Sequence, residues 1–265
     1  STASTLIPYI ATLQSILTQY ISSASICDCI IHTLLRIAQI GSQSCLSILK
    51  SGLLSNIDTV IITHISRTSL LCNIMSLLSY FTELQYGIGC IVDTNCFLSV
   101  LRAFGLCLQE STKEKNECLL LMLQFIQRVV LKSSRGFELF LTNNGYDLVM
   151  TCWQKSSGFM MLRKEVLNCL CEVLQHEEGN EQLQYLHLVE ALLQEKGSET
   201  SSDYLRDFWN TINSFLQFHG EILTQSEEEL ILAAILHALK DGSQIGVVAR
   251  PLFTLISFSV FSASR

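Results

Sequence analysis

Two short cysteine motifs contain the residue types that most often hold a metal ion. One is Cys-Asp-Cys at residues 27–29, close to His32, and the other is Cys-Leu-Cys at residues 169–171. Paired cysteines in structural zinc sites are separated by two to four residues, whereas each of these pairs is separated by one. On a helix, residues two positions apart point about 200° from each other. We therefore predict no metal site and interpret these cysteines as core residues.

Six histidines could serve as general bases or as partners of a nucleophilic cysteine. They are scattered along the chain at positions 32, 64, 176, 187, 219 and 237. None belongs to a recognisable catalytic signature, although a Cys-His pair could still assemble in space. The Gly-Ile-Gly run at residues 87–89 lacks the third glycine and the acidic residue of a dinucleotide site, so we interpret it as a loop between helices. We predict no catalytic residue and no cofactor.

Three basic residues form a candidate partner-binding surface. Arg128, Lys132 and Arg135 stand at i, i+4 and i+7, which predicts one face at the end of a helix over 114–132. Adjacent repeats could add Lys155, Arg163 and Lys164. A solvated ridge with favourable charge near a helix C-terminus also explains this pattern. The alternative is a surface that binds an acidic partner.

An apolar stripe is the second candidate, on a helix expected over 203–218. It includes Phe208, Trp209 and Phe215 among aliphatic residues at helical spacing. Such a stripe is usually core, and the alternative is a groove for an amphipathic partner segment. The last expected helix, over 246–262, is more apolar than a solvent-facing end repeat should be. That predicts further repeats, a partner or a second copy over this end.

The elements that carry these residues are expected to be helical throughout. The chain has 265 residues, is 49% hydrophobic and contains only 2 prolines and 13 glycines. This composition allows a sizeable core, and alternating Val/Ile/Thr runs typical of strands are hard to find. Helical spacing of apolar residues predicts helices over 5–20, 24–40, 43–51, 53–63, 67–84, 95–109, 114–132, 135–143, 146–155, 159–175, 180–195, 203–218, 226–240 and 246–262.

Hydropathy and cysteine content limit the environment of the chain. Polar or charged residues interrupt every long apolar segment, so we expect no membrane-spanning helix. The sequence opens without a secretion signal, and eleven cysteines, an odd number, fit a reducing intracellular compartment, whether nucleus or cytoplasm. The chain also lacks an initiating Met, which suggests a piece of a longer protein.

Charge is distributed unevenly along the sequence. Residues 1–164 carry a net charge of +3 and residues 165–265 carry −10, within a total of −7. A weakly basic first half could meet an acidic partner. It is far from the basic stripe that nucleic-acid binding usually needs, so we do not expect nucleic acid as a partner.

Short helices separated by Gly or Asn recur along the chain. Around Gly52, Asn95 and Gly145, apolar residues stand four positions before and five and eight positions after the central residue, and these centres are 43 and 50 residues apart. Gly, and at some cost Asn, is the residue type that follows a helix ending in the left-handed conformation. The spacing predicts a repeated corner between two helices, in units that bury their apolar faces by stacking.

This corner resembles that of armadillo-like (ARM/HEAT-type) helical repeats, whose units contain about 40 to 47 residues. The resemblance covers residues 24–175 and implies an all-α fold, an α-solenoid of stacked repeats wound as a right-handed superhelix. It implies an array over residues 1–197, followed by C-terminal helical capping repeats over 198–265 that are continuous with it. The Ser-, Gly- and charge-rich stretch around residues 194–203 is the most linker-like segment.

The resemblance also implies a function, that of a non-enzymatic scaffold binding a partner protein or peptide within a larger intracellular complex. Residue usage is similar to that of armadillo-like scaffolds in chromosome-maintenance, meiotic and centrosomal assemblies. The Trp and Asn ladder with which nuclear import adaptors hold basic peptides is missing, which argues against binding of basic localisation peptides by that mechanism. The candidate partner is a protein with an acidic or amphipathic segment. The alternative is an all-helical enzyme or small-ligand bundle, which would need a closed pocket with converging polar groups.

Overall fold

The computed structural model describes residues 2–110, 112–194, 201–240 and 245–262, and all regular secondary structure in these ranges is helical, as predicted. The chain divides into two compact units, Ser1–Asn143 (unit 1) and Asn144–Arg265 (unit 2). The predicted start of the capping repeats, between residues 197 and 198, falls within residues 195–200, which lie outside the described ranges, so it stays a prediction. Helix α14 (Ser202–His219) packs on α11 (Met160–Val173) within unit 2.

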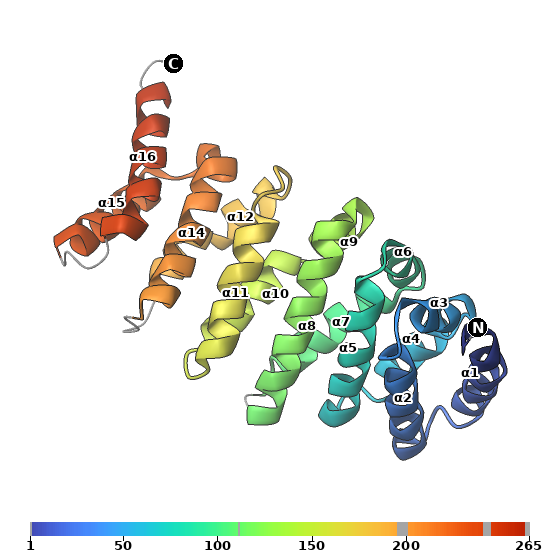
Figure 1. Cartoon of the computed structure of the whole chain (residues 1–265). Coiled ribbons are helices and arrows are strands. Elements are labelled where there is room, and N and C mark those ends of the chain that lie inside the picture. Colours follow the sequence, from blue (N-terminus) through green and yellow to red (C-terminus); the bar gives the residue numbers. More distant parts are fainter. Residues whose placement is uncertain (1, 111, 195–200, 241–244, 263–265) are drawn as a thin grey trace. The chain divides into compact units, whose positions relative to one another are not determined.

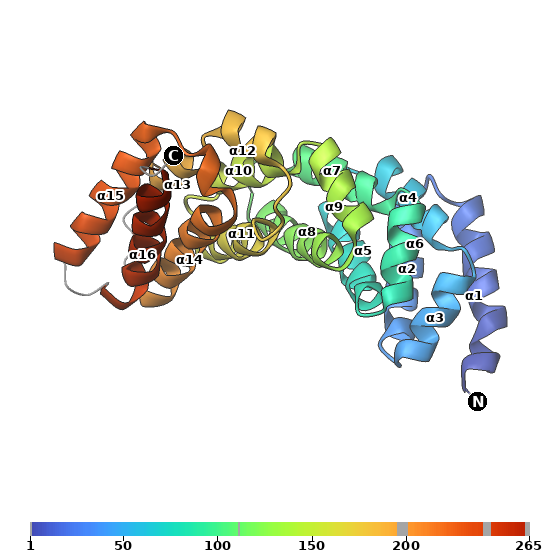
Figure 2. The ribbon, with the colours of Figure 1, turned by 90° about the horizontal axis from the view of Figure 1, so that it is seen from above.

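Three of the long helices of unit 1, α2, α5 and α8, lie side by side (Figure 1). In each, apolar residues three and four positions apart face the unit's interior, as Leu71, Met75 and Leu78 do in α5. Shorter helices cover the other side, where α4 packs on α7 (Figure 2). The helices of this unit are α1 (Thr2–Gln19), α2 (Ala24–Ala38), α3 (Ser42–Lys50), α4 (Leu54–Thr63), α5 (Thr68–Thr82), α6 (Gln85–Asp93), α7 (Cys96–Cys107), α8 (Lys113–Lys132) and α9 (Ser134–Thr142).

Unit 2 repeats this two-layer plan. Its long helices α11, α14 and α16 pack in a row, while α10, α12 and α13 lie on the other side (Figure 2). The remaining helices of this unit are α10 (Gly145–Lys155), α12 (Asn180–Leu186), α13 (Leu188–Gln194), the 3-10 helix η1 (Gly220–Ile222), α15 (Gln225–Lys240) and α16 (Ile245–Ser262). In each unit a row of three long helices forms one layer, as expected for stacked helical repeats.

The predicted corners exist, with one register error and one omission. Gly52, Asn95 and Asn144 have positive φ angles of 79°, 60° and 55°, so the left-handed residue of the third corner is Asn144 and not Gly145. Counting from Asn144 places Tyr146, Val149, Cys152 and Trp153 at the buried positions +2, +5, +8 and +9. These are the positions that Leu54, Ile57, Val60 and Ile61 occupy after Gly52.

A fourth corner was not predicted. The expected helix over 180–195 is two helices, α12 and α13, because His187 between them adopts the left-handed conformation at φ 45°. Leu183, Val189 and Leu192, at −4, +2 and +5 from His187, are buried as at the other corners. Histidine gives no sequence signal for this conformation, since Gly and Asn are the residue types that favour it.

We expect His187→Gly to stabilise the protein by about 1 kcal/mol, because glycine adopts positive φ without the clash of a Cβ atom. The His187 side chain is 56% exposed and 4.0 Å from Glu227, so losing this contact costs little. Tyr185→Gly, at an 83% exposed position inside α12, should destabilise by a similar amount and serves as the control. Urea denaturation measures both, and destabilisation by His187→Gly would contradict the strained corner.

The prediction of a loop at residues 87–89 is wrong, because these residues lie inside α6. Two glycines make this stretch a poor helix former. The first turn of α6 lies against the end of α5: a Cβ atom added to Gly87 would come 2.2 Å from the carbonyl oxygen of Phe81. Close packing between helices therefore selects glycine here.

Two pairs of short helices have the combined length and hydropathy of a membrane-spanning segment. In the described part of the chain, no single helix is long and apolar enough to cross a bilayer. The pairs α3–α4 and α6–α7 satisfy length and composition only when taken together, and they are bent by 78° and 73° at their corners.

Candidate functional site

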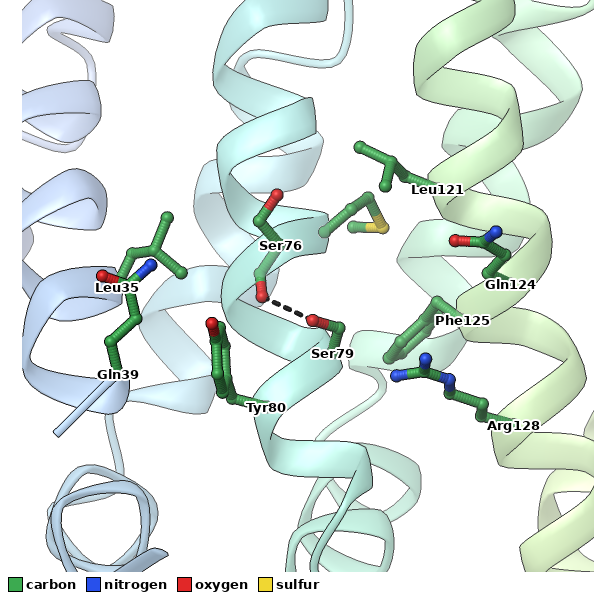
Figure 3. Close-up of a pocket in the computed structure, with 10 residues that line it drawn as sticks. Leu35, Gln39, Ser76, Ser79, Tyr80, Leu121, Gln124, Phe125 and Arg128 are labelled. Carbon is green, nitrogen blue, oxygen red and sulfur yellow. Dashed lines mark hydrogen bonds between the residues drawn. The ribbon is translucent and has the colours of Figure 1, made fainter. Parts of the chain in front are cut away.

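The long helices of unit 1 form an open groove with a volume of about 370 Å³. Figure 3 shows its lining side chains converging from three consecutive long helices. The lining consists of Leu35 and Gln39 from α2, Met75, Ser76, Ser79 and Tyr80 from α5, and Leu121, Gln124, Phe125 and Arg128 from α8. Met75 and Phe125 are 1% exposed and form an apolar floor, while polar side chains form the walls. We call this surface the unit 1 groove.

Several polar groups of the unit 1 groove are available to a ligand. Ser79 donates a hydrogen bond of 2.7 Å to the carbonyl oxygen of Ser76 and is therefore engaged within α5. Within the ranges that the structure covers, no hydrogen bond engages the side chains of Gln39, Tyr80 or Gln124. Tyr80 is 37% exposed. An amide side chain offers donors and an acceptor, which suits binding to a peptide backbone.

The three predicted basic residues do not share one surface. Arg128 lines the unit 1 groove and lies 3.1 Å from Glu83 at the end of α5. Lys132 donates a 2.9 Å hydrogen bond to the carbonyl oxygen of Thr82, the last residue of α5. Arg135 lies on the next helix, α9, and pairs with Glu138 at 2.7 Å.

The predicted single face is wrong because α8 ends at Lys132. Ser133 then caps α9, its side-chain oxygen accepting a 3.0 Å hydrogen bond from the backbone N–H of Gly136. The i+7 relation to Arg135 therefore does not continue along one helix. Of the three residues, Arg128 alone lines the unit 1 groove.

The additional basic residues belong to unit 2 and are engaged there. The guanidinium of Arg163 stacks 4.0 Å above the Trp153 ring and is almost fully buried, as a cation–π contact. Lys164 lies 3.8 Å from Asp207. Arg163 is therefore part of the interior of unit 2 and is not exposed to a partner.

The apolar stripe on α14 is core, the usual case for such a stripe, and not the alternative groove for a partner segment. Phe208 and Trp209 are 0% exposed and Phe215 is 2% exposed. Phe208 meets Trp209 edge-to-face at 5.5 Å, a favourable geometry for aromatic pairs. A partner cannot reach these three side chains in the folded protein, because α14 buries its stripe between α11 and α16.

The cysteine and histidine candidates give no reactive centre. Cys27 is buried and Cys29 exposed, so the two thiols face in opposite directions, as helical spacing predicts. Cys27 does meet a histidine distant in sequence, with its Sγ atom 3.9 Å from Nε2 of His64. Burial raises the pKa of this thiol, which disfavours the nucleophilic thiolate. Within the described ranges no three His, Cys, Asp or Glu residues are arranged to hold a metal ion.

The C-terminal helices expose apolar side chains in unit 2. Leu232 and Leu236 on α15 are 43% and 49% exposed, and Phe253 and Ile256 on α16 are 69% and 49% exposed. The prediction that further repeats, a partner or a second copy cover this end stays a prediction. These four residues define the surface on which it depends.

Comparison with known proteins identifies the fold. No family model and no curated protein matches the sequence. A computationally designed armadillo repeat protein for modular peptide recognition is 13% identical, with a TM-score of 0.70 over 93% of this chain and 98% of that one. A designed armadillo repeat protein in complex with the peptide (KR)4 is 12% identical, with a TM-score of 0.72 over 94% and 99% of the two chains.

A third neighbour is an engineered protein, Northeast Structural Genomics Consortium target OR329. It is 14% identical, with a TM-score of 0.70 over 94% of this chain and 96% of that one. Identities this low establish the fold alone. Together with the repeated corners and the rows of long helices in each unit, they show that the chain is an all-α solenoid of armadillo-like helical repeats.

Proposed function

We propose that the chain is a non-enzymatic scaffold that binds an extended segment of a partner protein in the unit 1 groove, within a larger intracellular complex. The observation that carries the proposal is the groove itself, which is open, crosses α2, α5 and α8, and presents unengaged polar side chains over an apolar floor. Peptide recognition by the designed armadillo repeat proteins of the same fold supports it.

The dimensions of the unit 1 groove set the length of the bound segment. Packed helices lie about 8 to 10 Å apart, so crossing three of them requires about 18 Å. An extended chain advances about 3.3 Å per residue, which corresponds to five or six residues. Gln39 on α2 and Gln124 on α8 are placed to bind backbone groups of such a segment on either side of Tyr80.

Charge favours an acidic segment. Arg128 is the one charged residue in the lining of the unit 1 groove. Its side chain is 41% exposed and that of its partner Glu83 is 63% exposed, so their ion pair is weak and a carboxylate of the ligand can compete with Glu83. A basic peptide would meet Arg128 unfavourably.

The unit 1 groove lacks the chemical groups that an enzyme or a nucleic-acid-binding protein would need there. The lining of the unit 1 groove contains no His, Cys, Asp or Glu, so it offers no general acid, base or nucleophile of these types. Nucleic-acid binding would require several cationic contacts and would weaken steeply with salt. Arg128 alone supplies no such surface, and we expect affinity for the protein partner to vary little with salt by comparison.

Arg128→Glu should weaken peptide binding by about tenfold or more, because it replaces the attraction of a guanidinium by repulsion, and a factor of ten corresponds to about 1.4 kcal/mol. The probe is an acidic peptide of about six residues selected from a random display library against the wild-type protein. Its Kd is measured for each variant by titration calorimetry.

Arg135→Glu is the matched control, since Arg135 pairs with Glu138 on α9 outside the unit 1 groove. Its Kd should stay close to the wild-type value. Lys132 is left unchanged because it binds the end of α5, so its substitution would also alter stability. Selection of basic peptides only, or equal loss of affinity in both variants with unchanged melting temperatures, would contradict the proposal.

A further inference from the structure

A mostly apolar cleft lies between α13 and α15 in unit 2. These two helices pack against each other, and the cleft has a volume of about 380 Å³. We call this surface the unit 2 cleft. It does not include Leu232 or Leu236, which stand on another face of α15. Its lining consists of Glu190, Leu193 and Gln194 from α13 and Leu230, Ala233, Ala234 and His237 from α15.

The unit 2 cleft has the residue spacing of a groove that binds a helix. Its residues on α15 stand at i, i+3, i+4 and i+7 and those on α13 at i, i+3 and i+4, so each helix contributes one stripe. Leu230 is 39% exposed and Ala233 is also exposed, so the described part of the chain leaves this stripe open. The small side chains of Ala233 and Ala234 leave room for larger ones of a partner. An amphipathic helix enters such a groove with apolar residues at the same spacing.

The segments that follow the two helices in the sequence do not have the chemistry to fill the unit 2 cleft. Residues 195–200, after α13, read EKGSET, and residues 241–244, after α15, read DGSQ. Neither contains Leu, Ile, Val, Met or an aromatic residue. Because burial of apolar surface drives association, the cleft requires an apolar occupant other than these segments.

Charge favours a basic partner over a second copy of this chain. Glu190 contributes a carboxylate to the unit 2 cleft, where Gln194 donates a 2.8 Å hydrogen bond to one of its oxygens and no Lys or Arg of the described ranges pairs with it. Glu229 is exposed and stands four positions before Ala233, so it adds a second carboxylate beside the cleft. Residues 165–265 carry a net charge of −10, so two copies would repel each other at this surface.

We propose that the unit 2 cleft binds an amphipathic helix of a partner protein, which presents apolar residues at i, i+3, i+4 and i+7 and a Lys or Arg that pairs with Glu190. This interaction does not depend on the proposed peptide binding. The unit 1 groove belongs to the other unit and takes an extended segment, so either proposal can fail without the other.

Selection from a display library of helical peptides tests this proposal with the full chain. Peptides of about 14 residues form four helical turns, and the library is randomised along one face and its flanks. The selected peptides should carry apolar residues at the spacing of the cleft with Lys or Arg beside them. They should gain helical circular dichroism on binding, and titration calorimetry measures the Kd of one of them for each variant.

Leu230→Ala should weaken binding of the selected peptide by about tenfold, because it removes apolar surface that the peptide buries. Glu190→Lys should weaken it by about tenfold as well, because it replaces attraction of the basic residue by repulsion. The matched control is Leu232→Ala, which shortens a 43% exposed leucine of the same helix outside the lining. Its Kd should equal that of the wild type.

A selected peptide whose affinity is unaffected by Leu230→Ala, or is reduced equally by Leu232→Ala, would overturn the unit 2 cleft as the binding site. Selection of acidic peptides only would overturn the basic partner. Sedimentation velocity provides the third comparison: wild-type dimers that Leu230→Ala dissociates would assign the cleft to a second copy of this chain and overturn the proposal.

Discussion

Gly87→Ala is expected to destabilise the protein by about 3 kcal/mol, a large effect for the addition of one methyl group. The Cβ atom of alanine would stand 2.2 Å from the carbonyl oxygen and 2.9 Å from the carbonyl carbon of Phe81, and 3.3 Å from Cδ1 of Leu49. The nearest atoms are backbone atoms of α5, which cannot rotate away as a side chain would. Relief of the clash requires α6 to move away from α5.

The matched control lies two residues away in the same helix. Gly89 is exposed, and a Cβ atom added there meets no heavy atom within 4 Å. Gly89→Ala should therefore stabilise the protein by about 0.5 to 1 kcal/mol through helix propensity. Urea denaturation followed by circular dichroism compares the variants, and equal effects of the two would show that α6 does not pack closely on α5.

Phe208→Ala is expected to destabilise unit 2 by about 3 to 5 kcal/mol, the range for removing a buried phenylalanine side chain. Phe208 is 0% exposed, and its ring lies 5.5 Å from that of Trp209 and 6.5 Å from those of Trp153 and Tyr204. These neighbours come from both α10 and α14, so they cannot fill the cavity without a shift of one helix relative to the other.

Phe218→Ala is the control, because Phe218 lies on the same helix but is only partly buried beside an open depression near Gly220. It should cost about 1 kcal/mol or less. The midpoint of thermal unfolding distinguishes the two variants. A Phe208→Ala protein that unfolds at the wild-type temperature would return Phe208 to the set of surface residues available to a partner.

The four corners differ in how well the neighbouring residues of the sequence predict them. Gly52 and Asn95 could be located because a left-handed residue between two apolar helices strongly favours these types. At the third corner the adjacent pair Asn144 and Gly145 offered two candidates, and glycine is the stronger signal, yet the structure uses asparagine. At His187 the stacking of α12 and α13 holds an unfavourable residue in the same conformation, which no local preference predicts.

For the candidate site, helical spacing alone could not identify which residues share an open surface. Helical spacing correctly placed Arg128 and Lys132 together on α8, but it could not show that Lys132 binds the end of α5 or that Arg135 begins another helix. An apolar stripe such as that of Phe208 looks the same whether a partner or the rest of the chain buries it. The unit 1 groove was missed because its polar residues come from three helices far apart in sequence.

The sequence by itself determined the all-helical class, most helix positions and the repeated corner, because apolar periodicity and left-handed turns are properties of a few neighbouring residues. Only the tertiary structure decided which faces remain open. Stacking of α2, α5 and α8 creates the unit 1 groove, while stacking of α14 on α11 and α16 buries Phe208. These outcomes depend on contacts between residues more than 40 positions apart, which no short pattern encodes.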